Sequence, residues 1–413
     1  MEDVTLPPQD KPDGRIPLVA VTGSLPLGGS STFLVNLAKA FRERELILPI
    51  VSLSESNELD AEFVSAGARV ISISNRTRIY EDRLKVAYEE TARFRPRAVM
   101  ACLGAESFEV IRLIPPSCFR IGLIQSHDPG PYSISRQYAK WIDAMVGVST
   151  EISRFLKTMP EFSGHRVETI PYGISFKPTV ERRVLPADAP LQIIYLGRMA
   201  EVQKRVSRLV ELVRRLEEHG ENVIFTFAGG GAQLPEVKEA LAGSRLARFL
   251  GEIPNSTVQS LLATQDIFVL LSDFEGLPLT LLEAMGQGVV PVVSDLESGI
   301  RDVISESCGI RIRTGDVAAA ADAIIRLNAD RQRLQLMAQA ASKIARTEFN
   351  AGRMAGKYLE LVESAAGSRT VWPQKVSISA PMGLSPFLFS GLPRIGRRFL
   401  KKNFAGVFSR RRV

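Results

Sequence analysis

Short runs of apolar residues without charges recur along the chain, and between them apolar residues return every three or four positions. A short uncharged run is typical of a strand buried on both faces of a parallel sheet, and the longer spacing is typical of an amphipathic helix. The predicted strands lie at 16–21, 47–53, 69–73, 98–102, 120–124, 144–149 and 167–173 in the first half, and at 192–196, 223–228, 248–253, 267–271 and 289–293 in the second. This alternation of strands and helices predicts an α/β protein with two doubly wound parallel sheets.

A polar, proline-rich segment separates the two predicted sheets, and such segments are typical of linkers between domains. We therefore expect two Rossmann-like domains, each built on one sheet. The expected parts are a flexible N-terminus at 1–15, an N-terminal domain at 16–177, a linker at 178–190, a C-terminal domain at 191–350, a terminal helix at 351–366 and a basic tail at 367–413.

Composition favours a globular protein, since 45% of the 413 residues are hydrophobic and 23% are charged. The three cysteines, Cys102, Cys118 and Cys308, are scattered and odd in number, which favours buried thiols in a reducing compartment. No signal peptide and no apolar run long enough to span a bilayer can be read in the sequence. We therefore expect a cytoplasmic protein.

The net charge of +7 is concentrated at the C-terminal end, where residues 371–413 carry nine basic and no acidic residues. The rest of the chain is almost neutral, which argues against a nucleic-acid-binding protein. Residues 394–408 place apolar and basic side chains on opposite arcs of a helical wheel, a pattern typical of helices that lie on anionic membranes. Peripheral contact with the inner face of a membrane is one expectation for this tail; disorder and packing on the protein are the alternatives.

The stretch 272–288, Ser-Asp-Phe-Glu-Gly-Leu-Pro-Leu-Thr-Leu-Leu-Glu-Ala-Met-Gly-Gln-Gly, joins two predicted strands through a short helix. Glu275 follows the first strand, on the side where open α/β sheets bind ligands. It also precedes a helix start, whose free N–H groups favour anions or hydroxyls. Glu283 lies among apolar residues of the helix, and a buried carboxylate needs a partner. Both carboxylates are candidates for ligand binding.

This stretch resembles the signature of the retaining glycosyltransferases of family 4, the group 1 glycosyl transferases, in residue types, spacing and flanking strands. The resemblance covers roughly residues 16–366 and implies the GT-B fold, in which two Rossmann-like domains face each other across a cleft. It places the acceptor on the N-terminal domain and the nucleotide sugar on the C-terminal domain. It also implies that Glu275 faces the donor sugar, with the Gly276 and Leu277 backbone N–H groups nearby, and that Glu283 binds the ribose.

Other positions of the family pattern follow predicted strands. Arg198, preceded by Gly197, and Lys204 resemble the family's pair that holds the donor diphosphate, a role suited to a planar guanidinium and a point charge. Gln203 and Arg205 depart from the family pattern, where an acidic residue and a glycine are common. By resemblance, His127 contacts the donor sugar from the other domain. The remaining donor-binding positions implied are Gly28, Gly29, Gly229, Gly230 and Ile253.

The first glycine-rich turn differs from a phosphate loop of nucleotide triphosphatases. Gly23 and Gly28 have the spacing of that loop, but Gly29 stands where its lysine is required. The turn still allows close approach to a sugar or phosphate, because it joins a strand to a helix that we expect at 32–44.

The predicted function is retaining transfer of a hexosyl unit from a UDP- or GDP-sugar to an acceptor hydroxyl, with a lipid-linked or cell-surface glycan as the expected acceptor. We predict no cofactor, and metal-independent chemistry because no Asp-x-Asp motif is present. The alternatives are a non-catalytic GT-B partner subunit, which degenerate charged positions would favour, and a nucleotide-sugar epimerase, which needs no acceptor.

Overall fold

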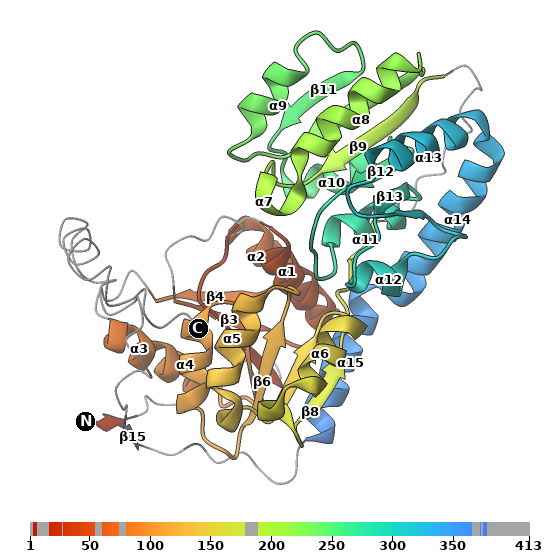
Figure 1. The fold of residues 1–413 in the computed structure, drawn as a ribbon. Helices are drawn as coiled ribbons and strands as arrows, with labels where there is room; N and C mark the ends of the chain where they lie inside the picture. Colours follow the sequence, from red (N-terminus) through yellow and green to blue (C-terminus); the bar gives the residue numbers. More distant parts are fainter. Residues whose placement is uncertain are drawn as a thin grey trace, which may run out of the picture.

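The computed structural model describes residues 3–5, 16–26, 28–53, 60–73, 80–177, 189–365, 372 and 375–377. Most of the predicted linker at 178–190 and the whole predicted membrane segment at 394–408 lie outside these residues. The described chain forms two α/β units, one above the other in Figure 1, each with a parallel sheet flanked by helices. Two doubly wound parallel sheets were predicted, and this prediction is confirmed.

The first sheet has seven parallel strands in the order β4-β3-β2-β5-β6-β7-β8. Its strands are short and largely free of polar interruptions, so both faces can be covered by helices. The strands are β2 (Leu18–Thr22), β3 (Pro49–Ser52), β4 (Arg69–Ser72), β5 (Ala98–Ala101), β6 (Phe119–Ile124), β7 (Ala144–Gly147) and β8 (Arg166–Thr169). The order reverses between β2 and β5, which makes the ends of these strands a ligand-binding position of open sheets.

The second sheet has six parallel strands in the order β11-β10-β9-β12-β13-β14. They are β9 (Leu191–Leu196), β10 (Val223–Ala228), β11 (Ala247–Gly251), β12 (Ile267–Leu270), β13 (Val290–Ser294) and β14 (Ile310–Ile312). Here the order reverses between β9 and β12. The loops that follow these two strands therefore lie side by side, although they are far apart in the sequence.

Helices cover both faces of each sheet and supply most of the remaining core (Figure 1). Those of the first unit are α1 (Gly29–Arg42), α2 (Asp60–Ala66), α3 (Tyr80–Arg93), α4 (Ala105–Leu113), α5 (Pro129–Gln137) and α6 (Thr150–Thr158). Those of the second are α7 (Glu201–Lys204), α8 (Val206–Glu218), α9 (Leu234–Ala240), α10 (Asn255–Leu262), α11 (Leu279–Gly286), α12 (Gly299–Val303), α13 (Val317–Ala329) and α14 (Arg331–Glu348). No helix of the described part is long and apolar enough to cross a membrane.

The last long helix, α15 (Ala351–Ser364), returns to the first unit and packs against α1. Tyr358 of α15 lies 6.2 Å from Phe33 of α1, measured between ring centroids. Just before it, Asn350 forms a parallel bridge with Ile174, so the two chain crossings between the units touch each other. The short strand β15 (Lys375–Ser377) then pairs with β1 (Asp3–Thr5), and Trp372 packs on Tyr88 of α3.

Two predicted boundaries are wrong in ways that matter for the site. The helix expected at 32–44 begins at Gly29, because the two glycines already satisfy the backbone geometry of a helix start, with Gly28 at φ 144. The strand expected at 167–173 ends at Thr169. Pro171 has no N–H to donate to a neighbouring strand, and the chain turns here toward the bridge with Asn350.

Candidate active site

The reversal of strand order in the second sheet brings two loops together. One follows β9 and includes Gly197, Arg198 and α7, and the other follows β12 and includes Glu275. Gln203 joins the two loops twice. Its side-chain amide donates to the Phe274 carbonyl at 3.1 Å, and its backbone carbonyl accepts from the Asp273 N–H at 2.9 Å.

Lys204 and Glu275 form an ion pair between these loops, with 2.6 Å between Nζ and Oε1. Only 6% of the Glu275 side chain and 16% of the Lys204 side chain are exposed. Solvent therefore screens this pair less than it screens a surface pair, and each charge depends on the other for compensation. Two residues that were predicted separately as catalytic thus form a single unit.

Arg198 is exposed, and no carboxylate of the described residues lies in ion-pair contact with it. Tyr195 holds the Arg198 backbone in place, because the Tyr195 hydroxyl donates to the Arg198 carbonyl at 2.7 Å. Burial raises the pKa of Tyr195 well above its ordinary range, and Glu275 adds to this, so the phenol stays protonated and can donate. The site therefore holds one cation that is paired with a carboxylate, Lys204, and one, Arg198, that has no carboxylate partner among the described residues.

Glu283 lies inside α11 and is 6% exposed. Burial raises its pKa to about 7, and the Lys39 ammonium of α1 partly opposes this rise. No residue of the described part donates a hydrogen bond to its carboxylate, which leaves its oxygens as acceptors for a ligand.

The N-termini of α1 and α11 face each other across the two units. A Cβ atom placed on Gly29 would lie 3.5 Å from the Leu279 side chain. Neither helix has a side chain that caps its first turn. The third N–H of each helix donates to the carbonyl of the preceding residue Gly28 or Pro278, so the first two N–H groups of each helix are the ones available to a ligand. Gly28 and Gly29 therefore contribute an opening in the first unit directly opposite the start of the Glu283 helix.

The remaining predicted glycines allow close backbone approach. A Cβ on Gly229 would lie 2.0 Å from the Gly197 carbonyl oxygen, and one on Gly230 would lie 2.1 Å from the Glu252 carboxylate. A Cβ on Gly276 would lie 2.2 Å from the Gln125 carbonyl oxygen in the first unit. Ile253 is half-buried beyond the end of β11, at the outer edge of the same sheet.

His127 follows β6, two residues after the Gln125 carbonyl that Gly276 approaches. Its Nδ1 lies 2.6 Å from the Tyr132 hydroxyl, and its ring packs edge-on against Tyr132 and Phe155. The structure therefore brings His127 to the boundary between the units, on the side of the loop that carries Gly276 and Leu277.

Sequence reasoning missed several residues that shape this region. Asp273, two positions before Glu275, forms an ion pair of 2.6 Å with Arg208 of α8. Asp302 of α12 accepts a hydrogen bond of 2.7 Å from the Thr150 N–H at the start of α6, across the two units. An aspartate two positions before Glu275 was a usable signal, whereas a contact between residues 152 positions apart has no local signature.

A metal centre is not built by the described residues, among which no group of three or more His, Cys, Asp or Glu side chains could hold an ion. The charged groups at the site are instead Arg198, Lys204, Glu275 and Glu283. This set suits a ligand that combines an anionic portion with several hydroxyls.

Residues 177–344 match the family described as "Glycosyl transferases group 1". The amylovoran biosynthesis glycosyltransferase AmsK of Erwinia amylovora is 31% identical over 187 residues, which cover 43% of this chain and 46% of AmsK. A glycogen synthase of Mycobacterium tuberculosis is 28% identical over 168 residues, which cover 40% of each chain. The chain thus spans less than half the length of these curated relatives.

Solved structures show the same architecture over most of the chain. The sucrose-phosphate synthase of Thermosynechococcus elongatus has a TM-score of 0.69 at 16% identity, covering 84% of this chain and 98% of its own. The pneumococcal O-GlcNAc transferase GtfA, solved with UDP and GlcNAc, has a TM-score of 0.68 at 13% identity, covering 85% of this chain and 99% of its own. The chain therefore has the GT-B fold, and its second half carries the sequence pattern of the group 1 glycosyltransferases.

Proposed function

We propose that this protein is a retaining glycosyltransferase of family 4 that transfers a hexosyl unit from a UDP- or GDP-sugar to an acceptor hydroxyl. The observation that carries the proposal is the Lys204–Glu275 pair beside Arg198, at the strand-order reversal of the second sheet; Arg198 forms no ion pair with a carboxylate of the described part. Two helix N-termini face each other beside it. This arrangement supplies cations for a diphosphate and carboxylates for sugar hydroxyls within one cleft.

In the proposed reaction the bond between the sugar C1 and the diphosphate oxygen breaks, and a bond from C1 to the acceptor oxygen forms on the same face of the sugar. Arg198 and Lys204 stabilise the charge that develops on the leaving diphosphate. Glu275 orients the donor sugar with the Gly276 and Leu277 N–H groups, and Glu283 holds the ribose. The leaving phosphate accepts the proton of the acceptor hydroxyl.

The first unit contributes the other wall of the cleft. Gly28 and Gly29 present the N–H groups at the start of α1, and His127 approaches the donor sugar from the end of β6. The contact between Gly276 and the Gln125 carbonyl and the hydrogen bond between Thr150 and Asp302 hold this wall against the second unit. Closure of the two units would exclude water, so transfer to an acceptor hydroxyl would be favoured over hydrolysis.

We propose a lipid-linked or cell-surface glycan as the acceptor. AmsK, similar to this chain over part of its length, is described as a glycosyltransferase of amylovoran biosynthesis. The basic residues of the tail favour attachment to an anionic membrane. The described part of the tail lies beside the first unit, since Trp372 packs on Tyr88 of α3 and β15 pairs with β1 (Figure 1). Sedimentation with anionic vesicles tests this: removal of residues 371–413 should abolish it, and unchanged sedimentation would rule it out.

Donor turnover tests the catalytic proposal. Purified protein is incubated with UDP- and GDP-hexoses in the presence of EDTA, with and without a mixture of lipid-linked glycans, and the configuration of the new bond is read by NMR. We expect one nucleotide sugar to be consumed, with retention at C1. Inversion of the configuration would refute the retaining mechanism, conversion of the free donor to its epimer would favour the epimerase, and the absence of turnover would favour a non-catalytic subunit.

A further inference from the structure

Next to the Lys204–Glu275 pair in the sequence is a second group of ion-paired side chains, which the proposed reaction does not use. Asp273 accepts hydrogen bonds from two arginines of the neighbouring loop and helix. Its Oδ2 accepts from Arg205 Nε, and its Oδ1 pairs with Arg208 Nη1 at 2.6 Å. The Asp273 side chain is 24% exposed. We call Asp273, Arg205 and Arg208 the rear cluster.

The rear cluster connects the same two loops as the Lys204–Glu275 pair, in parallel with it. Lys204 and Arg205 are adjacent in one loop, and Glu275 and Asp273 are two positions apart in the other, so the two ion pairs form successive cross-links. Arg208 adds a third connection, because its guanidinium also donates to the Leu271 carbonyl at 2.8 Å. The position of Lys204 therefore depends on contacts made by its sequence neighbour.

The backbone of Arg205 supports this interpretation. Arg205 has a left-handed conformation with φ 48 and ψ 53, and it ends α7 and begins α8. This conformation is unfavourable for a non-glycine residue, and glycine is the usual residue where it is needed. An arginine here is understandable if contacts of its side chain offset this cost. The contact with Asp273 is the stronger of its two carboxylate contacts, since Glu201 lies 3.8 Å away.

The electrostatics agree with an ionised Asp273. Burial acts to raise the pKa of its carboxyl, but hydrogen bonds from Arg205 and Arg208 outweigh burial and hold the pKa below its ordinary value. One carboxylate therefore contacts two guanidinium groups. In its absence Arg205 would keep only its longer contact with Glu201, at 3.8 Å, and Arg208 its hydrogen bond to the Leu271 carbonyl, so the link between the two loops would be weaker.

We propose that Asp273 is a positioning residue, which holds the loop from Arg198 to Lys204 in the conformation that receives the diphosphate of the donor. This inference rests on the proposed function. It makes a prediction opposite to that of simple electrostatics. Removal of a negative charge near an anionic ligand should strengthen diphosphate binding, whereas loss of a positioning contact should weaken it.

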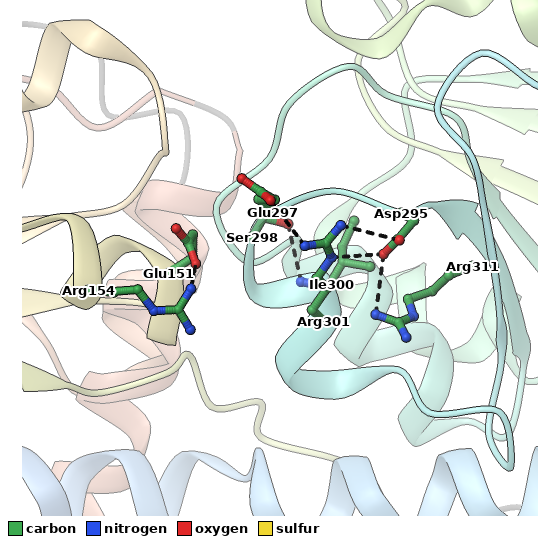
Figure 2. Close-up of polar contacts among 8 residues, drawn as sticks. All are labelled: Glu151, Arg154, Asp295, Glu297, Ser298, Ile300, Arg301 and Arg311. Atoms are coloured by element: carbon green, nitrogen blue, oxygen red, sulfur yellow. Dashed lines mark hydrogen bonds and ion pairs between the residues drawn. The ribbon is translucent and has the colours of Figure 1, made fainter.

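The chain contains a matched control. Asp295, which follows β13 in the same unit, also pairs with two arginines, Arg301 at 3.0 Å and Arg311 at 3.2 Å (Figure 2). Asp295 borders a hollow of about 310 Å³ beside β14, and none of the predicted site residues lines that hollow. The Asp295→Asn variant therefore removes the same chemical group from a similar cluster without changing the loop from Arg198 to Lys204.

The experiment compares a nucleoside diphosphate with its nucleoside. UDP and GDP are first titrated calorimetrically into wild type. The affinity of the diphosphate that binds is then measured by calorimetry, and that of its nucleoside by ligand-observed NMR, for wild type, Asp273→Asn, Asp273→Glu and Asp295→Asn. We expect Asp273→Asn to weaken binding of the diphosphate at least tenfold and binding of the nucleoside less than twofold. Asp273→Glu should recover part of the affinity, and Asp295→Asn should change neither ligand by more than twofold.

Other outcomes would overturn the proposal. Equal losses for diphosphate and nucleoside would show that Asp273 only stabilises the unit, and unchanged or tighter diphosphate binding would show that it has no positioning role. If Asp273→Asn does not fold, Arg205→Gly tests the same link, because glycine accepts the left-handed backbone; diphosphate affinity within twofold of wild type would refute the proposal. Absence of binding to folded wild type would instead contradict the proposed function itself, and the positioning role with it.

Discussion

Replacement of Glu283 by glutamine should stabilise the ligand-free protein at neutral and alkaline pH. Glu283 is buried inside α11, and burial raises its pKa from 4.5 to about 7. The folded protein therefore binds the Glu283 proton more tightly than the unfolded chain does. Stability from this group is greatest below pH 4.5 and falls as the pH rises toward about 7, because folding must then keep an ionised carboxylate buried.

The size of the effect follows from the two pKa values. Each pH unit between them corresponds to about 1.4 kcal/mol, so the interval from 4.5 to about 7 amounts to about 3 kcal/mol. Glutamine keeps the shape of the side chain and has no charge to bury. For a domain of 150–250 residues, about 3 kcal/mol corresponds to an increase of roughly 6–12 °C in Tm.

Differential scanning calorimetry of wild type and Glu283→Gln at pH 5 and pH 8 measures this difference. The two proteins should have similar Tm values at pH 5, and the variant should unfold at the higher temperature at pH 8. The same variant should bind the donor nucleotide about 10- to 100-fold more weakly, because a hydrogen bond to a charged acceptor is worth about 1.5–3 kcal/mol. Equal Tm values at both pH values would show that Glu283 has a charge partner in solution, and would refute the reasoning.

Two further predictions concern contacts of the same site. The Gly276→Ala variant should lose about 100-fold in transfer rate, because its Cβ would lie 2.2 Å from the Gln125 carbonyl oxygen and would force the two units apart. Steady-state kinetics check this against Gly243→Ala, whose Cβ meets no atom within 4 Å; equal rates for both variants would contradict it. The Lys204→Met variant should lose about 3 kcal/mol of stability in urea, because Glu275 would stay buried without its partner. Lys204→Met combined with Glu275→Gln should recover stability without recovering activity, and a double variant as unstable as the single one would argue against the pair.

Patterns of a few residues allowed the two sheets to be predicted. An uncharged run such as 267–271 is compatible with few environments other than a buried strand, and β12 lies within it. Boundaries were less predictable where backbone geometry decides them. The start of α1 depends on Gly28 and Gly29, and the end of β8 depends on where the chain leaves the sheet, which the apolar pattern does not encode.

The sequence singled out individual candidate residues but not their arrangement. Lys204 and Glu275 were each singled out, but their 2.6 Å contact depends on β9 lying next to β12 in the sheet. This neighbour relation cannot be read from the order of the strands along the chain. The role of Asp273 likewise appears only with the left-handed backbone of Arg205. An arginine at a position where glycine is common was the local signal for it.

Calorimetric titration of UDP and GDP into wild type and Arg198→Ala, in EDTA, tests the central claim most directly. The account predicts that one nucleotide binds wild type with 1:1 stoichiometry without a metal, and that Arg198→Ala weakens it at least tenfold through loss of a charge-assisted contact. Binding that requires a divalent cation would contradict metal independence. The failure of both nucleotides to bind folded wild type would contradict the assignment of this cleft to a nucleotide sugar.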